Sequence, residues 1–418
     1  MTRGARPGAA ARATAAPSAD CARIAARYPV VALVLQGGGA LGAYQGGVIE
    51  GLAQAGVEPN WVAGISIGAL NAAIWAGNPR ERRVERLRAF WETICRPPLL
   101  PASPLNAAPP ALEAWLHAWE QGMSAVYAGE AWRALLEGQN GFFRPRVPPP
   151  WSLHRPGPDA ASWYDTAPLR ETLERFVDFD RIAAKGSIRV SVGAVDVETG
   201  NFRYFDNREQ RLGPEHFMAS GALPPGFPAV RVDGRWYWDG GLVSNTPLQA
   251  VLAGAQRHHD VLAFQVDLWS ARGEAPRDLF EVANREKDIR FSSRTRWVTD
   301  RLQEEQRMAA LLRELLDLLP PRQREHPVAR RAAALADDRR VNVVHLILDD
   351  EPNEGHFKDY QFSLLSMRRH WARGLADLRG TFAHPDWLDR PVEATEPFVT
   401  HDLHRARRRG PGKEKART

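Results

Sequence analysis

Residues 29–56 read PVVALVLQGGGALGAYQGGVIEGLAQAG, and this stretch decides the fold class. Residues 29–36 form an apolar run of strand length, and the glycines after it lead into a segment of helical composition. Residues 57–65 give a second short strand, and a second helix is expected directly after Ser66. A strand, a tight loop and a helix in alternation are typical of an α/β protein with a buried parallel sheet.

The same alternation continues along the chain after a large insertion. The region from about 80 to 180 is predicted to be helical, with a Pro-rich loop inside it. Two strands are expected across 187–206 and a tight hairpin at 229–238, where Asp233-Gly234 is a type I′ turn pair. The remaining predicted elements are a buried strand at 261–269, helices over 277–340, a strand at 341–348 and a helix around 361–380.

Positive charge is concentrated at the two ends of the chain. Within a total of +5, residues 1–27 carry +4 and residues 405–418 carry +6, so residues 28–404 sum to −5. Neither end shows an apolar periodicity, which predicts disordered tails. Because the body is mildly acidic, we expect no sequence-specific nucleic-acid binding. The tails are expected to be solvated, and contact with anionic lipid is the alternative.

The compartment is indicated by what the sequence lacks. No window contains eighteen uncharged apolar residues, and the first residues lack the apolar segment of a secretory signal. Cys21 and Cys95 alone imply no disulfide framework, which fits a reducing compartment. We therefore expect a cytoplasmic protein, with peripheral contact at the inner membrane left open. No metal-ligand spacing stands out, and no metal or cofactor is expected. The oligomeric state is not determined.

The glycine loop has two interpretations. Gly37, Gly39 and Gly42 fit G-x-G-x-x-G between a strand and a helix, as in dinucleotide-binding proteins. That interpretation needs an acidic residue at the end of the second strand, whereas Glu58 lies at its start. The favoured interpretation is an oxyanion hole at a helix N-terminus. Its predicted donors are the backbone N–H groups of Gly37, Gly38, Gly39 and Ala40.

Residues 64–68, GISIG, match the G-x-S-x-G pattern. The flanking Gly64 and Gly68 allow a sharp strand-to-helix turn that leaves Ser66 exposed at a helix N-terminus. A serine hydroxyl has no useful acidity at neutral pH, so a nucleophilic Ser66 needs a base.

Two kinds of base are available. His345 lies in an apolar strand and reads more simply as a half-buried strand residue, and His258-His259 precede a strand without an assignable carboxylate. Asp239 ends the predicted hairpin strand, and tryptophans nearby indicate an apolar environment that would raise its pKa. On the hairpin alone, an aspartate that bonds its own backbone in the turn is the simpler interpretation.

Three segments in this order, QGGGALGAYQGGV, GISIGALNAA and DGGLVSNTP, resemble the blocks of the patatin-like phospholipases over about residues 31–252. That family uses a Ser–Asp dyad without histidine. The resemblance therefore implies Ser66 as nucleophile and Asp239 as base, with no cofactor. Further segments are similar to a bacterial subgroup with its own C-terminal extension. The glycines expected to support the turns are Gly42, Gly64, Gly68, Gly240 and Gly241.

The resemblance also implies a domain organisation. The expected fold is a three-layer α/β fold with a mainly parallel central sheet, helices on both faces and a mostly helical C-terminal extension. The expected parts are a disordered tail at 1–27, an acyl hydrolase domain at 28–270 with a helical insertion at about 80–180, a mostly helical region at 271–390 packed on it and a basic tail at 391–418.

The implied function is hydrolysis of lipid carboxylic esters through an acyl-enzyme. Many family members carry a basic residue where this chain has Leu41, so hydrolysis of short acyl, thioester or polyester substrates by the same dyad is an alternative. A nucleotide-binding protein and a catalytically silent lipid-binding protein are alternatives of another class. The Trp-rich segment 110–137 is expected to pack on the core, and a lid or membrane-contacting surface is its alternative.

Overall fold

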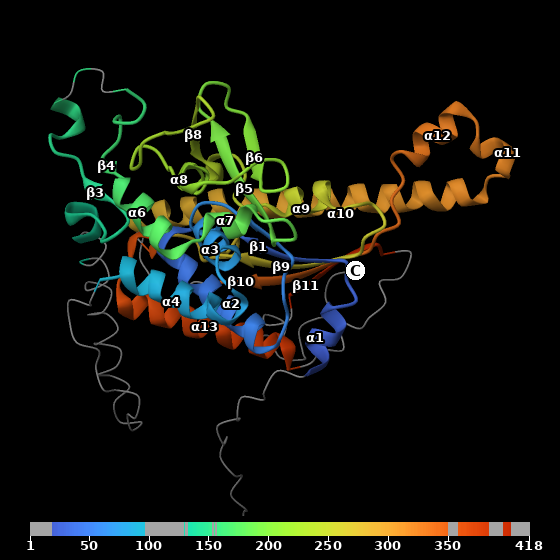
Figure 1. Cartoon of the computed structure of the whole chain (residues 1–418), viewed down its shortest axis with the longest axis horizontal. Coiled ribbons are helices and arrows are strands. Elements are labelled where there is room, and N and C mark those ends of the chain that lie inside the picture. The colour runs from blue at the N-terminus through green and yellow to red at the C-terminus, as the bar shows by residue number, and fades with distance from the viewer. Residues whose placement is uncertain are drawn as a thin grey trace, which may run out of the picture.

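The computed structural model describes residues 19–96, 129, 133–152, 154, 157–349, 358–383 and 396–402. Within these residues, one sheet has nine strands in the order β11-β10-β9-β1-β2-β5-β8-β7, with β6 paired to β5 (Figure 1). The run from β11 to β5 is parallel, and β6, β8 and β7 join it in antiparallel pairs. The strands are β1 Val30–Leu35, β2 Trp61–Gly64, β5 Arg189–Asp196, β6 Phe202–Asp206, β7 Val230–Val232, β8 Arg235–Asp239, β9 Val261–Asp267, β10 Val341–Ile347 and β11 Phe398–His401. The expected α/β fold with a mainly parallel sheet is confirmed.

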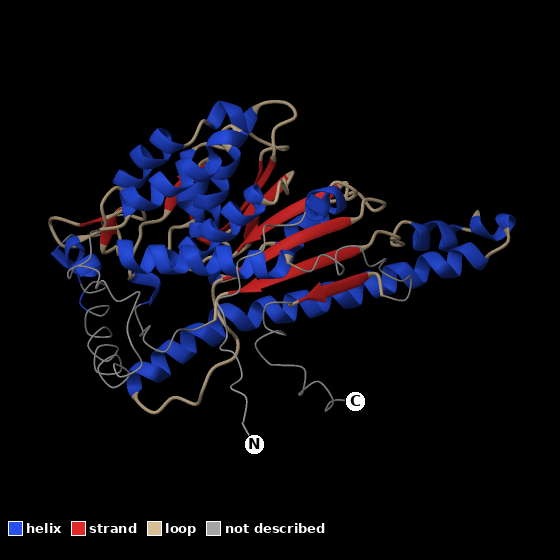
Figure 2. Cartoon of the chain, turned by 90° about the horizontal axis from the view of Figure 1, so that it is seen from below, coloured by secondary structure: helices blue, strands red, loops and turns tan. Residues whose placement is uncertain are grey.

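Helices cover both faces of this sheet. In Figure 1, α2, α4 and α13 lie on one side of the strands, whereas α9 and α10 lie on the other. The helices are α1 Ala19–Ala25, α2 Ala43–Gln54, α3 Ile67–Ala76, α4 Arg83–Ile94, α6 Ala167–Phe176, α7 Phe179–Ala183, α8 Pro214–Ser220, α9 Leu248–Gly254, α10 Leu279–Leu318, α11 Pro321–Arg324, α12 Pro327–Ala333 and α13 Leu364–Phe382, and the 3-10 turns nearest the site are η1 Gly39–Gly42, η5 Gly240–Leu242 and η6 Lys358–Tyr360. Figure 2 shows that α10 runs past the edge of the sheet and carries α11 and α12 at its far end.

The central strand β1 explains why helices cover both faces of the sheet. All six of its residues are buried, and it pairs with β2 on one side and β9 on the other. Because strand side chains alternate between faces, Val31, Leu33 and Leu35 enter the larger apolar core on the α2 side. Val30 and its alternate neighbours enter a second core with α9. A continuous apolar run is therefore what this strand requires.

The predicted hairpin is present. Strands β7 and β8 pair in antiparallel fashion, with Val232 opposite Arg235 across the turn. Asp233 and Gly234 both have positive φ, of 49° and 84°. Two consecutive positive φ values are what a type I′ turn demands, and Asp-Gly tolerates them best. This turn fixes the register of β8 and therefore the place where Asp239 leaves the sheet.

The two segments expected to be tails, 1–27 and 391–418, each contain a described element of secondary structure. Helix α1 lies inside the predicted N-terminal tail, where Cys21 and Ile24 are buried one helical turn apart. Strand β11 lies inside the predicted basic tail and pairs with β10 through Phe398, which is 1% exposed. Short apolar segments inside charged tails carry too little periodicity to be recognised before their partners are known. The Trp-rich segment 110–137 lies largely outside the described residues.

Helices α2 and α13 approach each other closely through glycines. A Cβ added at Gly47 would lie 1.9 Å from the carbonyl oxygen of Trp371, and one added at Gly374 would lie 2.0 Å from that of Tyr44. The Tyr44 hydroxyl also donates to the Asp377 carboxylate at 3.1 Å. The C-terminal helix is therefore part of the main core. None of the described helices is both long and apolar enough to cross a membrane.

We expect Gly47→Ala to lower the free energy of unfolding by about 3 kcal/mol, because the added methyl meets backbone atoms that can move only if the two helices separate. Gly226→Ala is the matched control, since a Cβ there meets no atom closer than 3.5 Å. That change should shift stability by less than about 0.5 kcal/mol. Urea unfolding of both variants measures the difference. Equal stabilities would show that α2 and α13 are not in close contact in solution.

Candidate active site

Ser66 occupies a sharp turn between β2 and α3. Its φ of 54° and ψ of −124° are unusual for a residue with a side chain, and such strain persists only where the surroundings hold it. The Ser66 N–H donates to the Ser220 hydroxyl at 2.9 Å, and that hydroxyl donates to the carbonyl of Gly193 at 2.7 Å. A Cβ added at Gly64 would lie 2.4 Å from the carbonyl oxygen of Gly68. One added at Gly68 would lie 2.4 Å from the carbonyl oxygen of Leu35, so both motif glycines are required by close backbone approaches.

Asp239 comes from the end of β8 and lies beside this turn. Its side chain is buried, with 3% of the residue exposed, and it accepts a hydrogen bond from the Gly241 N–H at 2.7 Å. Burial raises the pKa of the Asp239 carboxyl from an ordinary 3.8 to about 7, and the nearby Ser66 side chain and the Gly241 N–H oppose that rise. A carboxylate with a pKa near neutrality is a suitable acceptor for a serine proton. Ser66 and Asp239 line the same pocket.

The glycine loop lies between β1 and η1, and Gly37 lies against Ser66. Gly37 does not match the expected donor role, because its N–H donates to the Asn245 carbonyl at 3.3 Å. No described residue accepts a hydrogen bond from the N–H of Gly38, Gly39 or Ala40. Gly38 and Gly39 line the same pocket as Ser66. Their N–H groups are thus available to an oxygen atom in that pocket.

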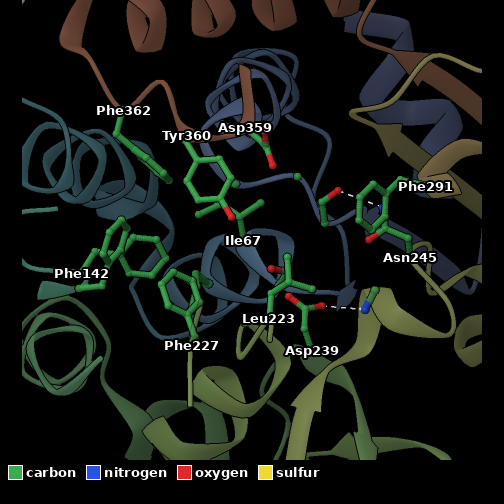
Figure 3. A pocket seen from close by; sticks show the side chains of 18 of the residues that line it. Ile67, Phe142, Leu223, Phe227, Asp239, Asn245, Phe291, Asp359, Tyr360 and Phe362 are labelled. Atoms are coloured by element: carbon green, nitrogen blue, oxygen red, sulfur yellow. Dashed lines mark hydrogen bonds between the residues drawn. The ribbon is translucent and has the colours of Figure 1, made fainter. Parts of the chain in front are cut away.

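The pocket has apolar walls. The cavity beside Ser66 is narrow, with a volume of about 70 Å³. Figure 3 shows Asp239 and Leu223 facing Tyr360 and the aromatic rings across this space. Its aromatic lining consists of Phe142, Phe143, Phe227, Trp269, Phe291, Tyr360 and Phe362. Burial raises the pKa of the Tyr360 hydroxyl, with added effects from the charges of Asp359 and Asp239. Such a lining suits an apolar substrate group.

Part of the pocket lining comes from η6, which lies more than 100 residues after Asp239 in the sequence. Lys287 and Asp288 on α10 form two reciprocal ion pairs with η6: the Lys287 ammonium lies 2.9 Å from the Asp359 carboxylate, and the Lys358 ammonium lies 2.7 Å from Asp288. A Cβ added at Gly39 would lie 2.3 Å from the Asp359 carbonyl oxygen. The ion pairs therefore hold η6, which includes Tyr360, directly against the glycine loop.

The histidines considered as alternative bases lie elsewhere. His345 Nε2 is 2.5 Å from Asp267 Oδ2, and both residues line a different pocket. His258 Nδ1 is 2.5 Å from Asp338 Oδ1 on an exposed surface. Neither residue lines the pocket that contains Ser66. Among the described residues, no group of three or more His, Cys, Asp or Glu side chains is arranged to hold a metal ion.

The family is decided by a match over the segment that contains the glycine loop, Ser66 and Asp239. A family model of patatin-like phospholipases matches residues 33–252, which is just over half of the chain. The chain belongs to the patatin-like phospholipases. A second family model, described as patatin phospholipase, matches residues 289–394 and so covers most of α10 and all of η6 and α13.

Solved structures similar to this patatin-like chain include two that are distant in sequence. VipD from Legionella pneumophila is 13% identical, with a TM-score of 0.34, and the match covers 89% of this chain and 71% of VipD. Human GIVD cytosolic phospholipase A2 is also 13% identical, with a TM-score of 0.30, and the match covers 59% of this chain and 45% of the human protein. With both TM-scores below 0.5, neither adds to the description of the site. A search of curated proteins gave no match.

Sequence reasoning missed several residues of this patatin-like site. The Ser220 hydroxyl accepts a hydrogen bond from the Ser66 N–H in the turn. The Trp269 indole Nε1 donates to the Gly37 carbonyl oxygen of the glycine loop at 2.8 Å. Trp269 follows β9 at the carboxyl edge of the sheet, where the ligands of α/β proteins bind. That position was the available signal for Trp269. Tyr360 offered no such signal, because it follows no strand.

Proposed function

We propose that this protein hydrolyses lipid carboxylic esters, with Ser66 as nucleophile and Asp239 as base. The observation that carries the proposal is that Ser66 and a buried carboxylate, whose pKa is about 7, line one pocket with an aromatic lining. Membership of a phospholipase family supports lipid as the substrate class. The nearest alternative is the same chemistry on short acyl, thioester or polyester substrates.

The proposed reaction has two stages. The Ser66 hydroxyl oxygen attacks the ester carbonyl carbon while Asp239 accepts its proton, and the carbonyl oxygen becomes an oxyanion. The N–H groups of Gly38, Gly39 and Ala40 donate to that oxyanion, and each aligned donor lowers the barrier by about 3 kcal/mol. Asp239 then gives the proton to the departing alcohol, which leaves Ser66 acylated.

Hydrolysis of the acyl-enzyme repeats these steps with water as the nucleophile. Asp239 accepts a proton from the water, the water oxygen bonds to the acyl carbon, and the Ser66 oxygen leaves and recovers the proton. The fatty acid is released and the resting site is regenerated. The same carboxyl therefore acts as base and acid in turn, which a pKa near 7 permits in both directions.

The test is hydrolysis of p-nitrophenyl esters from acetate to palmitate, followed by phospholipid and triacylglycerol vesicles. We expect kcat/KM to rise with acyl length, since each buried methylene contributes about 0.8 kcal/mol. A maximum at acetate or butyrate would favour the short-ester alternative. Binding to vesicles without turnover of any ester would favour a silent lipid-binding protein. Thermal stabilisation by NAD(H) or ATP, without labelling of Ser66 by a fluorophosphonate, would favour a nucleotide-binding protein.

A further inference from the structure

The carbonyl of Gly37 is held by two buried side chains from outside the glycine loop. The Asn245 amide Nδ2 donates to it at 3.1 Å, and the Trp269 indole Nε1 donates to it at 2.8 Å. Both residues are 3% exposed. A backbone carbonyl that receives two side-chain hydrogen bonds in the interior is fixed in direction, because moving it would leave two buried donors unpaired.

Fixing this carbonyl also fixes the next N–H group. The peptide unit is planar and trans, so the carbonyl of Gly37 and the N–H of Gly38 point in opposite directions. Among the described residues, that N–H has no acceptor. Donation to the carbonyl oxygen also polarises the amide and strengthens its N–H as a donor. Both effects bear on the group proposed to stabilise the oxyanion.

The two donors are themselves tied to the start of the loop by Gln36. Its side-chain oxygen accepts from the backbone N–H of Trp269 at 3.1 Å and from that of Leu268 at 2.6 Å. Its amide nitrogen donates to the Thr246 hydroxyl at 3.0 Å, and Thr246 follows Asn245 directly. Gln36 is completely buried. The end of β1 therefore anchors both segments that reach the Gly37 carbonyl.

We propose that Trp269 and Asn245 are positioning residues, which hold the Gly37–Gly38 peptide so that its N–H faces the developing oxyanion. This inference rests on the proposed acyl transfer at Ser66. Neither residue touches the reacting atoms in this role; each acts through the peptide.

The test is Trp269→Phe, which removes the indole donor and keeps an aromatic ring in the wall, together with Asn245→Ala. We expect kcat to fall about 10- to 100-fold in each variant, less than the full loss of an oxyanion donor, because the peptide is loosened but present. KM and the pH midpoint of activity should stay near the wild-type values. The rate at which a fluorophosphonate labels Ser66 should fall in parallel with kcat.

Trp61→Phe is the matched control. Its indole also donates a buried hydrogen bond, to the Ser191 hydroxyl at 2.9 Å, but it lies at the opposite end of β2 from the serine. We expect this variant to lose similar stability and to keep wild-type kcat. The inference is overturned if Trp269→Phe keeps kcat, if it raises only KM, or if Trp61→Phe loses as much activity. Absence of Ser66-dependent turnover in the wild type would instead contradict the proposed function itself.

Discussion

The Asp239→Asn variant is expected to lose activity by a factor of about 10⁴ or more toward every ester that the wild type cleaves. The amide keeps the size of the side chain and cannot accept a proton from Ser66. Ser66→Ala should remove at least as much activity and all labelling by a fluorophosphonate. Steady-state kinetics with a p-nitrophenyl ester measures both losses, and circular dichroism checks that each variant is folded.

His345→Gln is the control for this experiment, because His345 pairs with Asp267 outside the pocket and was the other base considered. Its kcat should match that of the wild type. If His345→Gln were inactive and Asp239→Asn were active, the base would be the histidine and the dyad would be wrong.

The second large effect is expected from pH. Asp239 must be ionised to accept the serine proton, and its pKa is about 7. The value of kcat/KM should therefore rise with pH, fall about tenfold for each unit below 7, and level off above it. A pH–rate profile measures the midpoint directly. A midpoint near 4 would mean that the carboxylate is solvated in solution and that burial does not tune it.

The raised pKa of Asp239 makes activity increase with pH, but it makes the stability of the folded protein decrease with pH. The folded protein holds the Asp239 proton up to pH 7, whereas the unfolded chain releases it near its ordinary value of 3.8. This group therefore contributes stability that is complete below about pH 4 and is lost as pH rises through 7. Between pH 5 and pH 8, the free energy of unfolding should fall by about 3 kcal/mol more for the wild type than for Asp239→Asn. Urea unfolding at both pH values tests this, and parallel losses in the two proteins would contradict it.

The turns of this fold were predictable from sequence because each is specified by neighbouring residues. Asp233-Gly234 determines a type I′ turn by itself, and the glycines around Ser66 permit a turn that other residues would block. A buried parallel strand such as β1 is also recognisable from an apolar run alone. These local signals located Ser66 and Asp239 before any contact between them was known.

Contacts between remote segments were not predictable in this way. The aromatic wall draws on Phe142, Phe227 and Tyr360, which share no spacing or motif. Gly37 was expected to donate its N–H to an oxyanion, but this N–H donates to the backbone carbonyl of Asn245. The side-chain amide of Asn245 donates in turn to the Gly37 carbonyl. Sequence alone identifies which residues have freedom to turn, but packing decides in which direction each peptide points.

The arrangement of η6 has a consequence for the order of events during protein synthesis. The ribosome adds Ser66 and Asp239 well before it adds residues 358–360. Strand β1 can pair with β9 only after β9 has left the ribosome. Domains begin to fold from the N-terminal side as they are made. From the addition of Asp239 until the addition of residues 358–360, the nascent chain therefore carries the serine and the carboxylate without the ion-paired η6 beside them. The lining of the pocket is complete only after residues 358–360 have been added and have folded against the glycine loop.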